Sequence, residues 1–102
     1  MKQTVPVAGV DVSKRFSDMC ILAPNNEIMA RLKIYHDLTS MERSVAELRR
    51  VENECGAAPV IVMESTSHYH LILFQFFREA GYEVIIVNPI QSGALKNIMS
   101  EK

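Results

Sequence analysis

Two short and almost continuous apolar runs constrain the fold of this 102-residue chain most strongly. Val5–Val12 reads Val-Pro-Val-Ala-Gly-Val-Asp-Val, and the apolar run Val60–Met63 is followed directly by an acid. Runs of this kind are typical of strands that are buried on both faces, as in parallel sheets covered by helices. Each run therefore predicts a central strand. Asp11 lies within the first run, and Glu64 follows directly after the second.

The rest of the sequence predicts further strands and helices around these two runs. Apolar and polar residues alternate poorly over Phe16–Ala23 and cleanly over Glu27–Tyr35, and Pro24-Asn25-Asn26 lies between the two segments. This pattern predicts two strands joined by a turn, with the second strand near a sheet edge. In that edge strand Ile28, Ala30, Leu32 and Ile34 share one face. The predicted strands are Val5–Val12, Phe16–Ala23, Glu27–Tyr35, Pro59–Glu64 and Glu83–Val87.

Three segments have helical signals. Thr39 and Glu42 fit a capping box, so the first helix is predicted over 40–54, with Gly56 as its stop. The second is predicted over Ser67–Ala80, and a last amphipathic helix over Ile90–Met99. The apolar stripe predicted for the second helix consists of Tyr69, Ile72, Leu73, Phe76 and Ala80.

The resulting order is βββαβαβα. Strands that are linked by helices are expected to be parallel, with right-handed crossovers, whereas the first three strands form an antiparallel meander. The fold class is therefore α/β, with a mixed five-stranded sheet in the order 3-2-1-4-5 and helices on its faces, which is the ribonuclease-H-like arrangement. A flavodoxin-like sheet is less favoured, because a tight turn rather than a helix joins two of the strands.

Asp11 and Glu64 are the candidate site residues. If their strands are parallel neighbours, both acids lie at the carboxyl edge of the sheet, where open α/β sheets bind ligands. Two adjacent carboxylates repel each other, and a divalent metal such as Mg²⁺ removes that repulsion. The alternative is structural: Asp11 caps the turn at Ser13-Lys14, and Glu64 pairs with Lys14 or caps the next helix. Asp18, on the second predicted strand, is interpreted as a surface or turn-facing acid.

Composition excludes several other classes of protein. A formal net charge of −1 argues against a domain that holds nucleic acid by charge alone. The chain has two cysteines without metal-ligand spacing and an N-terminus without an apolar leader, and its apolar runs are too short to span a bilayer. These features predict a cytoplasmic protein with free thiols and no membrane contact.

Three motifs carry a resemblance to a known family. Gly9–Lys14, Met63–Tyr69 and Val87–Pro89 resemble, in order and spacing, the motifs of the DEDD transposases of bacterial insertion sequences, which are related to site-specific DNA invertases. The resemblance implies an N-terminal RuvC-like domain and Mg²⁺, with two ions in the full-length enzyme. It also implies that Asp11 and Glu64 are the first two of four acids that bind metal and carry out catalysis.

The resemblance also has departures. No aspartate follows Asp37 and the chain ends at Lys102, so we expect 1–102 to be a domain truncated before its last two acids, without the C-terminal domain and inactive alone. Ser67 stands where the family usually has glycine. Weak nucleic-acid contacts are expected from Ser13, Lys14, Thr66 and Ser67.

The leading hypothesis is Mg²⁺-dependent DNA strand cleavage and transfer during transposition. DNA is the expected partner, a guide RNA is a further candidate partner, and a homo-oligomer is expected. One alternative is an actin-like ATPase or sugar kinase fragment, although residues 12–16 lack the glycine that such a phosphate-binding hairpin normally carries. The other is a non-catalytic oligomerisation module that uses the apolar stripe of Ile90–Met99.

Overall fold

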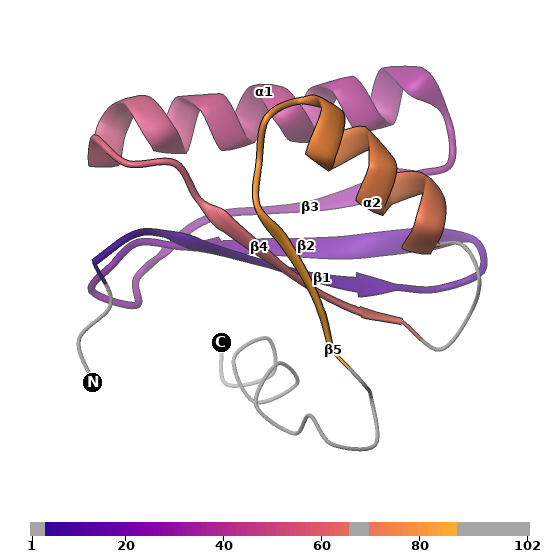
Figure 1. The fold of residues 1–102 in the computed structure, drawn as a ribbon, viewed down its shortest axis with the longest axis horizontal. Coiled ribbons are helices and arrows are strands. Elements are labelled where there is room, and N and C mark those ends of the chain that lie inside the picture. The colour runs from indigo at the N-terminus through magenta and orange to yellow at the C-terminus, as the bar shows by residue number, and fades with distance from the viewer. Residues whose placement is uncertain (1–3, 66–69, 88–102) are drawn as a thin grey trace.

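The computed structural model describes residues 4–65 and 70–87, which form one mixed sheet and two helices (Figure 1). The sheet order is β3-β2-β1-β4-β5, as predicted. β1 pairs antiparallel with β2 and parallel with β4, β2 pairs antiparallel with β3, and β4 pairs parallel with β5. The elements are β1 (Val7–Val12), β2 (Phe16–Leu22), β3 (Ile28–Tyr35), α1 (Leu38–Cys55), β4 (Val60–Ser65), α2 (His70–Glu79) and β5 (Val84–Val87). The predicted helix at Ile90–Met99 lies outside the described residues.

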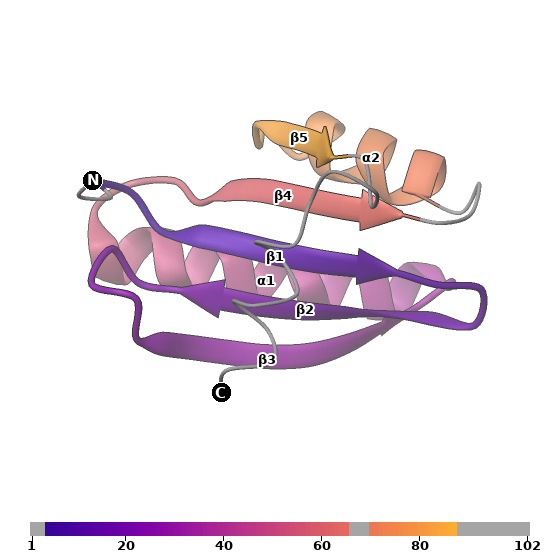
Figure 2. The same ribbon diagram turned by 90° about the horizontal axis from the view of Figure 1, so that it is seen from below.

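Both described helices cover the same face of the sheet, as the two views together show (Figures 1 and 2). Successive side chains of a strand point to opposite faces, so every second residue of each strand faces the helices. In β1 these residues are Ala8, Val10 and Val12, all of which belong to the buried core. Gly9 and Asp11 consequently lie on the opposite face.

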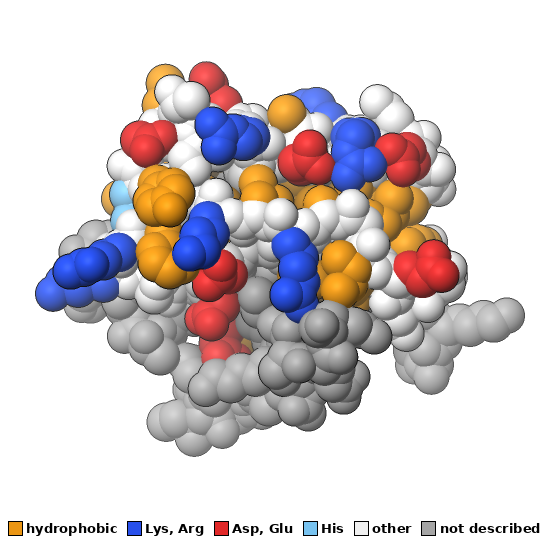
Figure 3. Space-filling model, turned by 180° about the vertical axis from the view of Figure 1, so that it is seen from behind, with side chains coloured by type: hydrophobic (Ala, Val, Ile, Leu, Met, Phe, Trp, Pro, Cys, Tyr) orange, Lys and Arg blue, Asp and Glu red, His pale blue; other side chains and the backbone are white. Residues whose placement is uncertain are grey.

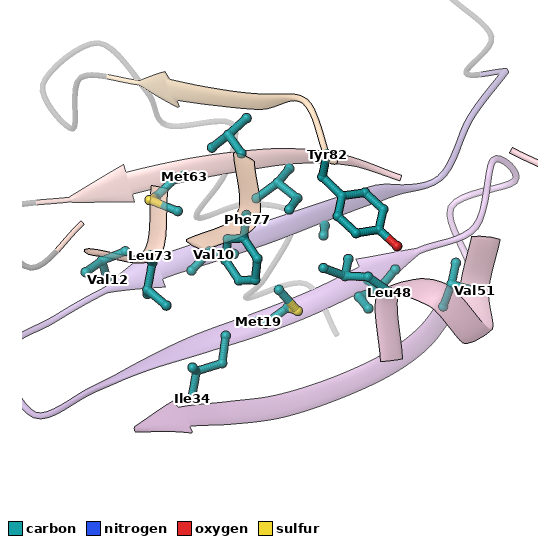
Figure 4. Close-up of a cluster of buried hydrophobic side chains, with 14 residues drawn as sticks. Val10, Val12, Met19, Ile34, Leu48, Val51, Met63, Leu73, Phe77 and Tyr82 are labelled. Atoms are coloured by element: carbon teal, nitrogen blue, oxygen red, sulfur yellow. The ribbon is translucent and has the colours of Figure 1, made fainter. Parts of the chain in front are cut away.

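The core lies between this face of the sheet and the two helices (Figure 4). Leu48 and Val51 come from α1, and Leu73 and Phe77 come from α2; all four are fully buried. The strands contribute mainly Ala8, Val10, Val12, Met19, Ile21, Ile34, Ile61, Met63 and Val84. The opposite face of the sheet carries the acids described below, together with the buried Cys20.

The N-terminal end of α1 corrects the predicted capping box. The N-cap is Asp37, which has extended backbone (φ −139°), and its carboxylate accepts a hydrogen bond of 2.7 Å from the backbone N–H of Ser40. Thr39 is exposed and already lies inside the helix. The cap depends on which residue has the non-helical backbone, which the spacing of Thr39 and Glu42 does not specify. The predicted stop is confirmed: Gly56 has a left-handed φ of 72°.

This cap gives a matched test of stability. Asp37→Ala is expected to lower the free energy of unfolding by about 1 kcal/mol, because the N–H of Ser40 loses its acceptor. Thr39→Ala is expected to change it by less than about 0.5 kcal/mol, as is usual for an exposed position. Urea denaturation of the two variants measures both values, and a larger loss in Thr39→Ala would contradict the assignment of the cap.

The buried face of α2 differs from the predicted stripe. Leu73 and Phe77 are fully buried, whereas Ile72 is 53% exposed. Phe76 and Ala80 pack at the edge of the core, and Tyr69 lies outside the described residues. The helix contains apolar side chains on most of its surface, so contact with β4 and β5, rather than the sequence pattern, decides which of them are buried. No helix in the described part of the chain is long and apolar enough to cross a membrane.

A β-bulge corrects the predicted face of Ile28. Ile21 pairs with Ala30 but Leu22 pairs with Ile28, so one residue, Met29, is inserted into β3. The insertion turns Ile28 away from the helices and leaves it 38% exposed, while Met29 packs against the core. Ala30, Leu32 and Ile34 keep the predicted face.

Tyr82 connects α1 to the segment that enters β5. Its hydroxyl donates a hydrogen bond of 2.9 Å to Glu52 Oε1 and accepts one of 3.3 Å from Arg49 Nη1. Burial, followed by the hydrogen bond to Glu52, raises the pKa of Tyr82 to about 12. The phenol is therefore a neutral donor at physiological pH and helps to fix β5 at its place in the sheet.

Candidate metal centre

The register of the sheet places Asp11 directly beside Glu64. Asp11 on β1 pairs with Glu64 on the parallel strand β4, close to the carboxyl end of both strands. Neighbouring strands are about 4.8 Å apart, and residues in register point to the same face. The two acids that the sequence singles out are therefore neighbours at the edge where α/β sheets bind ligands.

A third acid continues the same row. On the other side of β1, Asp11 pairs with Asp18 of β2, and Asp18 pairs in turn with Lys33 of β3. Asp18, Asp11 and Glu64, which we call the acid row, thus span three adjacent strands on the face away from the helices. Figure 3 shows acidic side chains at several places on this face, including a group near the middle of the view that has basic side chains beside it.

The structure adds Asp18 to the neighbours of Asp11, a pairing that the sequence interpretation did not include. Asp18 is half-buried and lies in register with Asp11. The pairing of Asp18 with Asp11 could have been predicted from the hairpin, because the length of the turn after Val12 determines which residue of the second strand lies opposite Asp11. In this hairpin Val12 pairs with Ser17, which places Asp18 opposite Asp11.

Glu64 is the most unusual member of the acid row. Its side chain is only 3% exposed, and its Oε2 atom has no hydrogen-bond partner among the described residues. A buried polar atom without a partner typically costs about 1–3 kcal/mol, and more when it is charged. One structural alternative, an ion pair with Lys14, is not formed among the described residues. The other, a cap of the next helix, involves residues 66–69, which lie outside the described residues. Within the described residues, one oxygen of this buried carboxylate is therefore left without a compensating partner.

The surroundings of Asp11 differ from those of Glu64. Asp11 is exposed and makes contacts of its own, and the turn that follows it is ordered by polar groups. The Ser13 hydroxyl donates to the backbone carbonyl of Phe16, and the His36 ring contacts the Ser13 carbonyl with Nε2 at 3.3 Å. Lys14 is exposed in this turn. Thr66 and Ser67, the other predicted nucleic-acid contacts, lie outside the described residues.

The donor chemistry of the acid row fits Mg²⁺. Mg²⁺ prefers oxygen ligands, is often held by one or two carboxylates, and completes its shell with water and phosphate oxygens. Asp11 and Glu64 supply two such carboxylates, one of them with an unpartnered buried oxygen. Within residues 4–65 and 70–87, no group of three or more His, Cys, Asp or Glu side chains has the geometry of a complete metal site. The described residues thus bring together two carboxylates, those of Asp11 and Glu64, as candidate ligands.

The sheet order and the position of the acids define the class of protein. A mixed sheet in the order 3-2-1-4-5, with acids at the ends of its two central strands, is an α/β domain of the ribonuclease-H-like class. Residues 8–102 match the model of the DEDD transposase family of the IS110 type (DEDD_Tnp_IS110, described as "Transposase"). The chain belongs to this transposase family. The family favours the transposase hypothesis over the ATPase or sugar kinase alternative.

A solved structure supports the fold independently. The crystal structure of the large terminase nuclease from thermophilic phage G20c is similar, with a TM-score of 0.54 and 16% sequence identity. The similarity covers 91% of this chain and 48% of that one, so the chain spans about half the length of the nuclease. At this level of identity the likeness shows the fold alone. No curated protein matches the chain.

Proposed function

We propose that the chain is the N-terminal RuvC-like catalytic domain of a DNA transposase that cleaves and transfers DNA strands with Mg²⁺. The observation that carries the proposal is the buried Glu64 carboxylate, which has an unpartnered oxygen and lies in register with Asp11. Membership of the transposase family supports the substrate class. In this proposal Asp11 and Glu64 are both metal ligands and catalytic residues, and they supply two of the four acids after which the family is named.

The two carboxylates have complementary roles in the proposed reaction. When bound, Mg²⁺ would stabilise negative charge on the scissile phosphate and on the attacking and leaving oxygens. Glu64 is held on a central strand between β1 and β5, so its carboxylate is fixed in position before the substrate arrives. Asp11 is the exposed member of the pair and faces the DNA phosphate that enters the site. Fixed groups contribute more to catalysis than mobile ones, because no reorganisation is needed.

The turn between β1 and β2 is proposed as the adjacent phosphate contact. Ser13 and Lys14 are exposed and follow Asp11 by only a few residues, so a phosphate at the acid row lies within reach of this turn. The net charge of −1 means that such local contacts, and not the overall field of the chain, orient the DNA. The same proposal includes weak nucleic-acid contacts by Thr66 and Ser67. It also includes a guide RNA as a further partner, a homo-oligomeric assembly and a cytoplasmic location.

Metal dependence is the experiment that tests this function. Supercoiled plasmid carrying the transposon end is incubated with the transposase produced from the natural gene, either with Mg²⁺ or with EDTA. Strand cleavage is expected with Mg²⁺ only, and Asp11→Asn is expected to reduce it by at least about a hundredfold, since metal chemistry typically contributes several kcal/mol. Glu27→Gln, which removes an exposed carboxylate from the far end of the sheet, is the control. Cleavage that survives EDTA or Asp11→Asn would refute the proposed function.

A further inference from the structure

We propose that Asp18 is a third functional carboxylate of the metal centre, a positioning residue that holds the water shell of the ion bound by Asp11 and Glu64. The inference rests on the proposed function and adds a residue to it. It starts from the register of the sheet, in which Asp18 occupies the position on β2 that Glu64 occupies on β4, one strand away from Asp11 on either side.

The geometry brings Asp18 close to Asp11 without making it a further direct ligand. Residues directly opposite each other on antiparallel strands have Cβ atoms about 4.5–5.5 Å apart, so the Asp11 and Asp18 carboxylates are neighbours on one face. The described side chains nevertheless form no three-ligand group of metal geometry. In the proposed role the Asp18 carboxylate accepts a hydrogen bond from a metal-bound water rather than binding the ion directly.

The charges around Asp18 support a role toward a cation. Like charges directly opposite each other on a sheet are destabilising, so Asp11 and Asp18 repel each other across the hairpin. The basic register neighbour of Asp18, Lys33, lies over the ring of Phe16, with Nζ at 4.4 Å from the centroid. No ion pair within the described residues joins Lys33 to Asp18. Lys33 therefore does not neutralise Asp18 through an ion pair, whereas a cation at the acid row would.

A second observation shows that the acid row is directed toward a ligand. Glu64 is almost completely buried, with 3% of its surface exposed, and its Oε2 atom has no partner among the described residues. Since Glu64, Asp11 and Asp18 are in register on one face, a cation that compensates Glu64 also relieves the repulsion between the two aspartates.

The test measures metal affinity and metal-free stability in the same variants. Mn²⁺ binding to the chain is followed by electron paramagnetic resonance with Mg²⁺ as competitor, and thermal unfolding is recorded in EDTA. Asp18→Asn is expected to raise the Kd for Mn²⁺ by about tenfold, the range seen when partners of metal ligands are removed. It is expected to raise the Tm in EDTA, because the repulsion with Asp11 is removed. Asp18→Glu is expected to keep the affinity within about threefold, because it keeps the carboxylate.

The outcomes separate this inference from the proposed function. A wild-type Kd in Asp18→Asn overturns the role of Asp18. A lower Tm in EDTA combined with weaker Mn²⁺ binding also overturns it, and shows that Asp18 has a structural role. If Asp18→Asn keeps the wild-type Kd while Asp11→Asn abolishes Mn²⁺ binding, only the role of Asp18 fails. If the wild-type chain binds no Mn²⁺, both the metal centre and the role of Asp18 fail. Glu27→Gln, which removes a carboxylate outside the acid row, is expected to match the wild type in both measurements.

Discussion

Glu64→Gln is expected to abolish DNA strand cleavage while making the metal-free chain more stable. The amide is close to the carboxylate in size but carries no charge, so it binds Mg²⁺ poorly, and losing several kcal/mol of charge stabilisation reduces the rate by at least about a thousandfold. The same change removes a charge that is 3% exposed and has an unpartnered oxygen. Removing that charge is expected to raise the free energy of unfolding by on the order of 1 kcal/mol.

The opposite signs of these two effects make the result diagnostic. Cleavage is measured on plasmid with the transposase produced from the natural gene, and stability by urea denaturation of the chain in EDTA. Glu83→Gln is the matched control, because Glu83 is an exposed glutamate just before β5. It is expected to change neither quantity beyond about 0.5 kcal/mol. If Glu64→Gln lost stability together with activity, Glu64 would be a structural acid and its assignment as a metal ligand would be wrong.

Phe77→Ala is the substitution with the largest expected effect on the fold. Phe77 is fully buried between α2 and the sheet, and its ring lies edge-on to Phe76 at 6.2 Å between centroids. Removing a buried phenylalanine side chain typically costs about 3–5 kcal/mol. Small domains are stable by only about 5–15 kcal/mol, so this single change removes a large share of the total. Urea denaturation followed by circular dichroism measures the loss.

Ile72→Ala in the same helix is the control for this prediction. Ile72 is 53% exposed, so its truncation is expected to change the free energy of unfolding by less than about 1 kcal/mol, and alanine favours the helix. Similar losses in Phe77→Ala and Ile72→Ala would contradict the observed packing of α2 on the sheet. The comparison also decides between the observed buried face and the one predicted from the sequence, which included Ile72 and not Phe77.

The parts of the fold that the sequence predicts are those controlled by local hydrophobicity. The apolar runs of β1 and β4 are typical of strands in the centre of a covered sheet, where both faces are buried. Their parallel pairing then follows from the order of the elements. That pairing is sufficient to predict Asp11 and Glu64 as neighbours. The family motifs agree with the same two positions, and the family model confirms the membership.

The parts that the sequence did not predict depend on register and on tertiary contact. The position of Asp18 beside Asp11 could be predicted only by counting the residue pairs of the first hairpin. The exposed face of Ile28 depends on a β-bulge that no local sequence pattern indicates. The N-cap was misplaced because Asp37 and Thr39 are both acceptable caps by type, and only the backbone conformation distinguishes them. On α2, apolar residues on several sides left the choice of the buried face to the sheet.

The two pairings of Asp11 have different consequences for how the domain assembles. Asp11 meets Asp18 through a short hairpin, which closes early and at little entropic cost. It meets Glu64 only after α1 has folded back and brought β4 alongside β1, a contact between distant parts of the chain that forms slowly. We therefore expect a nascent chain to pass through a stage in which Asp11 and Asp18 are paired before Glu64 joins them. The ability to bind a cation with both Asp11 and Glu64 would appear only when this last docking step is complete.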